Sequence, residues 1–126
     1  MSYVLKIHEK MIQRYSSLKG IRDENALRSA LSSAYTGFSN GEEAYPNLID
    51  KISVVSFKLI ANHPFVDGNK RVGAYVFLSL LKRYGFMTSF SKKDLEDTIL
   101  KVAAGDIDFE RFRDWAVAHV EKILHE

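Results

Sequence analysis

A short stretch in the middle of the chain concentrates side chains that could act on phosphates. It reads His63-Pro64-Phe65-Val66-Asp67-Gly68-Asn69-Lys70-Arg71, and apolar sequence lies on both sides of it. A histidine imidazole is the side chain best suited to take a proton from an attacking hydroxyl near neutral pH. A carboxylate oxygen can bind Mg²⁺, usually together with the phosphates of a substrate. The stretch therefore contains a candidate base, His63, and a candidate Mg²⁺ ligand, Asp67.

The second half of the stretch predicts an anion site. Gly68 can adopt backbone angles that other residues avoid. A helix that begins near Asn69 would direct its N-terminal N–H groups and the positive end of its dipole into the loop. The dipole disfavours Lys70 and Arg71 in the first turn, unless they bind a polyphosphate there. Gly68, Asn69, Lys70 and Arg71 are therefore candidate ligands of nucleotide phosphates.

Each of these residues also has an ordinary structural explanation. His63 could cap the preceding helix, Asp67 could be a turn residue, and Lys70 and Arg71 could be solvated. Each explanation is the more common one when its residue is taken alone. A structural turn, however, has no need of the whole ordered set.

The stretch resembles the signature of the Fic/Doc family, His-Pro-Phe-x-(Asp/Glu)-Gly-Asn-x-Arg-x-x-Arg. The matching residues are His63, Pro64, Phe65, Asp67, Gly68, Asn69 and Arg71. Two positions depart from the AMP-transferring members, which usually carry Gly where this chain has Lys70 and a second Arg where it has Ala74. This pattern is similar to the Doc branch, the death-on-curing toxins. So are three further segments: Gly20-Ile21-Arg22-Asp23, Ala26-Leu27-x-x-Ala30 and Gly41-Glu42-x-x-Tyr45-Pro46.

The resemblance implies a toxin that acts as a protein kinase. It would transfer the γ-phosphate of ATP to a threonine of elongation factor Tu and so block translation. His63 would be the base, Asp67 would bind Mg²⁺, and Gly68, Asn69, Lys70 and Arg71 would bind the ATP phosphates. Phe65 would anchor the loop in the core. Two other functions remain open, an AMP-transferring Fic-type enzyme and a catalytically inactive binding module.

A toxin of this kind needs an inhibitor, and the family's own inhibitory pattern, Ser/Thr-x-x-x-Glu-Gly/Asn, is absent from the sequence. The only Glu followed by Gly or Asn is Glu24, and Gly20 stands where the pattern requires Ser or Thr. We therefore expect inhibition by a second protein, an antitoxin whose C-terminal helix fills a groove near the active loop.

The composition favours a cytoplasmic protein with a single domain over residues 1–126. Lys plus Arg number 18 and Asp plus Glu 16, and no basic run exceeds two residues, which argues against a nucleic-acid or membrane surface. The chain has no cysteine and hence no disulfide or thiolate metal site. Lys6, Glu9 and Lys10 interrupt any apolar core of a signal peptide.

Helical spacing of apolar residues predicts an all-α fold, a compact bundle of about six helices. The expected helices span about 3–15, 23–34, 47–62, 69–84 and 91–104, and a last one begins near Asp108 and keeps Val120 and Ile123 in its apolar stripe. The segments 52–61 and 72–81 are apolar on almost every side, so we expect them to form the buried centre and to hold the active loop at their junction.

Three local features refine this prediction. Pro64 disfavours α-helical angles at the residue before it, so the third helix should end at about His63. The segment 86–90 should be extended. The polar segment from Thr36 to Pro46 corresponds either to the flap that aligns the target chain beside the active loop of Fic-type proteins or to a plain surface connection.

Overall fold

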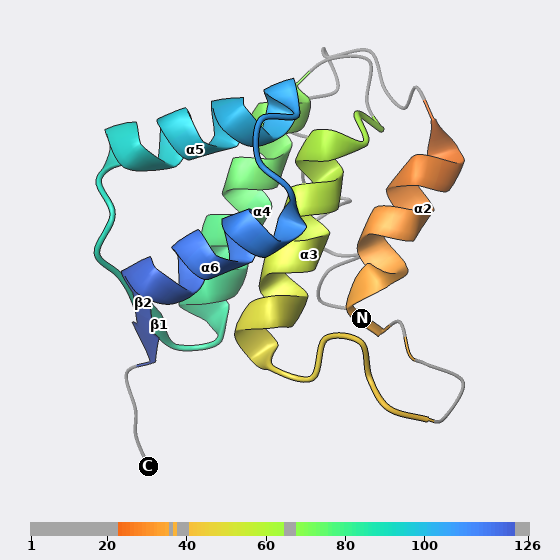
Figure 1. Cartoon of the computed structure of the whole chain (residues 1–126), viewed down its shortest axis with the longest axis horizontal. Coiled ribbons are helices and arrows are strands. Elements are labelled where there is room, and N and C mark those ends of the chain that lie inside the picture. Colours follow the sequence, from red (N-terminus) through yellow and green to blue (C-terminus); the bar gives the residue numbers. More distant parts are fainter. Residues whose placement is uncertain (1–22, 36, 38–40, 65–67, 123–126) are drawn as a thin grey trace.

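The computed structural model describes residues 23–35, 37, 41–64 and 68–122, and these residues form a helical bundle (Figure 1). Its elements are α2 (Glu24–Ser32), the 3₁₀ helix η2 (Ser33–Tyr35), α3 (Leu48–Ala61), α4 (Asn69–Arg83), β1 (Phe86–Thr88), α5 (Lys92–Ala104), α6 (Phe109–His119) and β2 (Val120–Lys122). The prediction of an all-α fold is confirmed. The first expected helix, over residues 3–15, lies outside the described residues.

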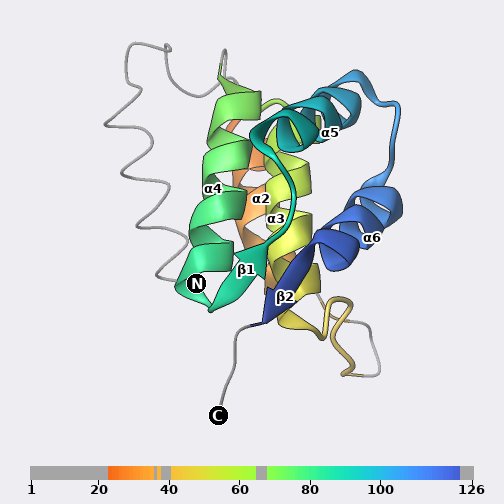
Figure 2. The same cartoon turned by 90° about the vertical axis from the view of Figure 1, so that its left-hand side faces the viewer.

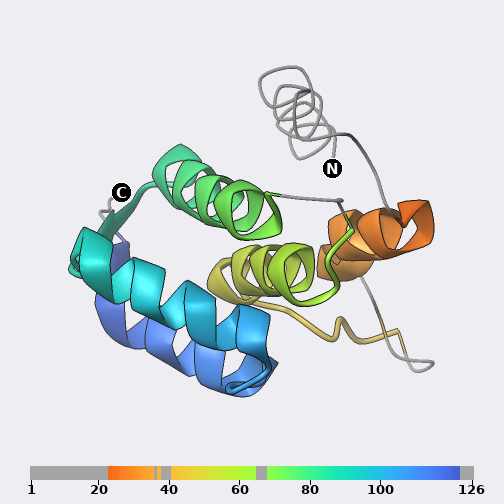
Figure 3. The same cartoon turned by 90° about the horizontal axis from the view of Figure 1, so that it is seen from above.

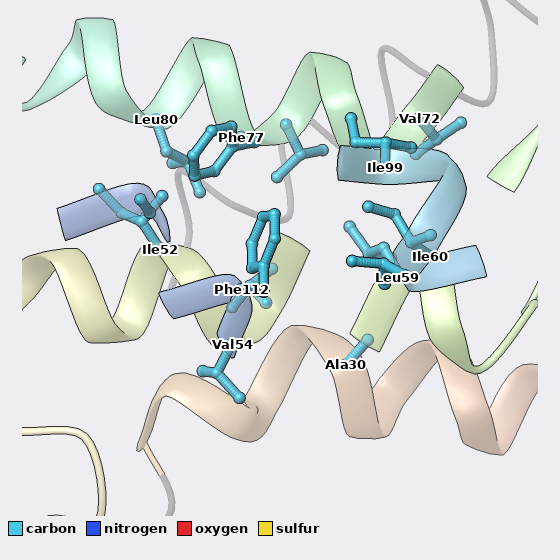
Figure 4. Close-up of a cluster of buried hydrophobic side chains, with 14 of the residues drawn as sticks. Ala30, Ile52, Val54, Leu59, Ile60, Val72, Phe77, Leu80, Ile99 and Phe112 are labelled. Atoms are coloured by element: carbon cyan, nitrogen blue, oxygen red, sulfur yellow. The ribbon is translucent and has the colours of Figure 1, made fainter. Parts of the chain in front are cut away.

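Helix α3 is the centre of the bundle and contacts α2, α4, α5 and α6 (Figure 3). Its residues from Ile52 to Ser56 are all buried, as are Leu59 and Ile60. This burial on almost every side explains why the segment from Ile52 to Ala61 carries one charged side chain, Lys58. Figure 4 shows Leu59 and Ile60 among the core side chains that the neighbouring helices contribute.

Helix α4 is buried on one side only, which corrects the prediction for segment 72–81. Val72, Gly73, Val76, Phe77, Leu80 and Leu81 are buried. Tyr75 and Leu78, in contrast, are 38% and 41% exposed. The helix therefore carries an exposed apolar face in addition to the face that packs on α3. None of the helices in the described ranges is long and apolar enough to span a bilayer.

Local side chains and glycines cap the helices. Asp23 accepts a hydrogen bond from the Ala26 N–H, and Asp108 accepts one from the Arg111 N–H. Ser91 and Asp94 form a capping box at the start of α5. At the other ends, Gly85 and Gly105 have left-handed φ angles of 82° and 80°. Local sequence therefore fixes where α2, α5 and α6 begin and where α4 and α5 end.

The end of the last helix differs from the prediction. Helix α6 stops at His119, and Val120 is extended rather than part of a helical stripe. Strand β2 pairs antiparallel with β1, and Val120 lies opposite Thr88 (Figure 2). The Ser89 N–H and hydroxyl both donate to the His119 carbonyl, at 2.8 and 3.1 Å. Pairing with a distant strand therefore overrides the helical pattern; Ile123 lies outside the described residues.

The described residues of the segment from Thr36 to Pro46 favour the plain connection over the flap. Gly37 and Glu43 form an antiparallel bridge, and Lys51 holds this connection by contacts with the Glu43 carboxylate and the Ala34 carbonyl. The connection leads into the N-terminal end of α3, whereas His63 follows its C-terminal end. A helix of 14 residues separates these ends by about 20 Å. The described part of this segment therefore lies at the other end of α3 from His63.

Close contact between α3 and α4 depends on Gly73. A Cβ atom at this position would lie 2.3 Å from Cγ1 of Ile60, whose side chain is fully buried. The Ser56 carbonyl oxygen would be 3.4 Å away. The two helices can therefore approach this closely only because residue 73 has no side chain.

We predict that Gly73→Ala destabilises the fold. Overpacking a core destabilises the folded state by about 1–3 kcal/mol, and the better helix propensity of Ala offsets up to about 1 kcal/mol of this loss. The free energy of unfolding, measured in urea, should therefore fall by about 1–2 kcal/mol. Ile60→Ala provides the control, because in that background the added methyl group enters vacated space and should no longer destabilise. Equal losses from Gly73→Ala in both backgrounds would contradict the proposed contact.

Candidate functional site

The two central helices meet at the motif, as predicted. Helix α3 ends at Ala61, and the Asn62 N–H donates to the Lys58 carbonyl at 3.0 Å to close its last turn. Helix α4 begins at Asn69, directly after Gly68. His63 and the phosphate-site candidates therefore lie on the two sides of one short connection between buried helices. Residues 65–67, which include Phe65 and the expected Mg²⁺ ligand Asp67, lie outside the described residues.

His63 has an exposed side chain on an unusual backbone. Its φ angle is 48°, in the left-handed region, and no other non-glycine residue in the described ranges has a positive φ. The following Pro64 disfavours the right-handed helical conformation here, as the sequence predicted. A non-glycine residue in the left-handed region costs free energy and persists only where its surroundings impose it. The imidazole is therefore presented to solvent from a constrained position.

Pro64 provides part of that constraint. Its side chain is fully buried, and its carbonyl accepts a hydrogen bond from the Asp23 N–H at 3.0 Å. This bond connects the motif to the start of α2, which is far away in the sequence. The sequence did not predict this contact, because no local signal indicates a backbone bond between distant segments.

The residues after the loop form the start of α4. Gly68 has a left-handed backbone with φ 81° and ψ 11°, and its carbonyl accepts the first helical hydrogen bond from the Val72 N–H at 2.9 Å. As a glycine it leaves the helix N-terminus without a capping side chain, in contrast to α2, α5 and α6. Lys70 and Arg71 follow in the first turn with exposed side chains. Such a helix start can accept a bulky anion.

Lys70 and Arg71 also line a groove of about 630 Å³ between α4 and α5. Its other lining residues are Ala74, Tyr75 and Leu78 on α4 and Lys92, Leu95, Glu96, Ile99 and Leu100 on α5. Figure 2 shows α5 crossing near the top of α4. The sequence did not predict the contribution of α5, although Lys92, Leu95, Glu96 and Ile99 have the spacing of one helix face.

The groove is mainly apolar, with cations in its lining. Leu78 and Leu100 are 41% and 54% exposed, although such side chains are usually buried. Among the described residues, the lining contains the cations Lys70, Arg71 and Lys92 and one carboxylate, Glu96. The groove therefore suits an apolar ligand that carries negative charge.

The described residues offer no preformed metal centre. No group of three or more His, Cys, Asp or Glu side chains lies together in ranges 23–35, 37, 41–64 and 68–122.

Comparison with known proteins agrees with the geometry. The Fic/DOC family model matches residues 1–81, which include α3, the motif and most of α4. Toxin Doc of Mycolicibacterium smegmatis is 36% identical over 73 residues, which cover 56% of this chain and 55% of that protein. The match therefore spans about half the length of this curated relative. Because the family model covers well over half of the chain, including the complete motif, the protein belongs to the Fic/DOC family.

Proposed function

We propose that the protein is the toxin of a toxin–antitoxin system and acts in the cytoplasm as a protein kinase. It transfers the γ-phosphate of ATP to a hydroxyl group of a target protein, a threonine of elongation factor Tu, and so blocks translation. The similarity to a protein named Toxin Doc supports the toxin assignment. The motif between α3 and α4 supports phosphate transfer.

One observation carries the choice of kinase over AMP transfer: Ala74 lines the same groove as Lys70 and Arg71. AMP-transferring members of the family carry at this position an Arg that holds the distal phosphates as the leaving group. A methyl group cannot replace the charged fork of a guanidinium. The groove thus lacks this phosphate ligand at the place where AMP transfer requires it, whereas Lys70 adds a cation one residue before Arg71.

The proposed roles follow from the positions of the residues. Bound ATP supplies the phosphoryl group, and Mg²⁺ held by Asp67 offsets its negative charge. Gly68, Asn69, Lys70 and Arg71 bind the phosphates at the start of α4, and they stabilise the charge that develops during transfer. His63 accepts the proton of the attacking hydroxyl, a role for which its exposed imidazole is accessible to a large protein substrate.

The transferred group tests this proposal directly. The protein is incubated with elongation factor Tu, Mg²⁺ and ATP labelled at either the α or the γ phosphorus. We expect label from the γ position only. Label from the α position would establish AMP transfer without the second Arg, and no label on any protein of a cell lysate would favour an inactive binding module. Ala74→Arg should raise AMP transfer only weakly, since Lys70 still occupies the position of the family's glycine.

A second prediction concerns His63. His63→Ala should lower the rate of transfer by about 10²- to 10⁴-fold, the usual contribution of a general base. Its free energy of unfolding should change by less than about 0.5 kcal/mol, because the side chain is exposed. His63→Gly is the matched control for backbone effects, since glycine adopts the left-handed conformation without strain. Transfer within a few-fold of wild type in both variants would instead assign His63 a structural role.

The groove between α4 and α5 is the proposed site of the antitoxin. Its apolar lining and the cations Lys70, Arg71 and Lys92 suit an amphipathic helix with acidic residues. A helix placed there would also cover Lys70 and Arg71, so inhibition follows from exclusion of the nucleotide phosphates. The expected antitoxin is the product of a neighbouring open reading frame, which should restore growth when it is expressed with the toxin.

We predict that charges placed in the groove weaken antitoxin binding. In a His63→Ala background, which avoids toxicity, Leu78→Asp and Leu100→Asp should each raise the Kd by about 30-fold or more, as expected for interface hot spots. Met87→Asp and Val117→Asp are matched controls, because these side chains are 58% and 50% exposed but lie outside the groove lining. Equal effects at all four positions in a calorimetric titration would place the antitoxin elsewhere.

A further inference from the structure

Asp23 takes part in three hydrogen bonds at the start of α2. Its carboxylate accepts from the Ala26 N–H at 3.0 Å, and its carbonyl accepts from the Leu27 N–H at 3.1 Å. Its own N–H points away from the helix and donates to the Pro64 carbonyl at 3.0 Å. The carboxylate and carbonyl of Asp23 therefore bond within α2, whereas its N–H bonds to the motif.

Helix α2 gives this contact a rigid base. Leu27, Ala30 and Leu31 are buried, and the helix packs along α3. Because the side-chain cap fixes the first turn, the direction of the Asp23 N–H is set by the docked helix. The same Pro64 whose carbonyl accepts this bond has a fully buried ring. Pro64 is consequently fixed by the burial of its ring and by the hydrogen bond to its carbonyl.

His63 lies between this anchored residue and the end of α3. Its φ angle of 48° is unfavourable for a residue with a side chain, so contacts on both sides must maintain it. The last turn of α3 is closed by the bond from Asn62 to Lys58, on one side, and the bond from Asp23 to Pro64 acts on the other. Loss of either restraint would let the backbone at His63 relax.

We propose that Asp23 is a positioning residue for His63. By capping α2 it keeps its own N–H directed at the Pro64 carbonyl, and through Pro64 it holds the imidazole in place for proton transfer. Its effect on activity rests on the proposed function. Its effect on the conformation of His63 does not. The competing explanation is that Asp23 only stabilises α2, as any N-cap does.

Asp108 offers a matched control, because it is an Asp N-cap that accepts from the Arg111 N–H at 2.9 Å at the start of α6. Asp23→Ala and Asp108→Ala each remove one capping carboxylate, but only Asp23 is bonded to the motif. Asp23→Asn restores a capping oxygen and should rescue the function. If Asp23→Ala fails to fold, Asp23→Gly replaces it, since glycine is tolerated at an N-cap.

We expect Asp23→Ala to lower kcat for phosphate transfer by about 10- to 100-fold, as small misplacements of a catalytic group do. The KM for ATP should change less than twofold, because Lys70 and Arg71 are positioned by α4. Asp108→Ala should lower the melting temperature similarly but leave kcat within twofold. A fall in kcat that is equal in both variants, or one that Asp23→Asn does not rescue, would overturn the proposal.

Nuclear magnetic resonance provides a measurement that does not require activity. Asp23→Ala should shift the ring signals of His63 and speed hydrogen exchange at the residue 23 amide, whereas Asp108→Ala should change neither. Unchanged His63 signals in Asp23→Ala would refute the positioning role even if the protein proves to be no kinase. If these signals shift but no variant transfers phosphate, the proposed function fails and the inferred contact stands.

Discussion

The close packing of α3 against α4 is the constraint on which the rest of the structure depends. The two helices approach so closely at Gly73 that the Ile60 side chain occupies the space that a side chain at residue 73 would need. Because both helices are anchored in the core, the loop that joins them has little freedom at either end. His63 and Gly68, the residues that flank this loop, both adopt left-handed backbones. A rigid pair of helices thus imposes the local geometry at the motif.

Helix α4 faces the core on one side and the groove beside α5 on the other. Its inner face, with Val76 and Phe77, is buried in the core, and its outer face, with Ala74 and Leu78, lines the groove beside α5. Lys70 and Arg71 stand at the start of that outer face. The helix therefore links the phosphate-site candidates to an apolar surface that a ligand or partner can cover. This arrangement allows one occupant of the groove to control access to the motif.

Much of the fold could be predicted because it is specified by neighbouring residues. Asp23, Ser91 and Asp108 begin helices as the sequence indicated, since a cap acts on amides only three residues away. Pro64 and Gly68 mark the junction for equally local reasons. The candidate site was recognisable from the order of residue types in the motif, which needs no knowledge of distant segments.

Contacts between distant segments decided the parts of the fold and of the candidate site that the sequence did not predict. Val120 is extended rather than helical because it pairs with β1. The Asp23 N–H donates to the Pro64 carbonyl because α2 packs along α3. The groove exists only because α5 crosses α4, and the connection before α3 lies far from His63 because α3 runs the length of the bundle. The sequence by itself determined the helices, their caps and the order of residue types in the motif, since these depend on residues a few positions apart. Only the tertiary structure decided what surrounds the motif, because backbone hydrogen bonds and packing between distant segments leave no periodic or local signal in the chain.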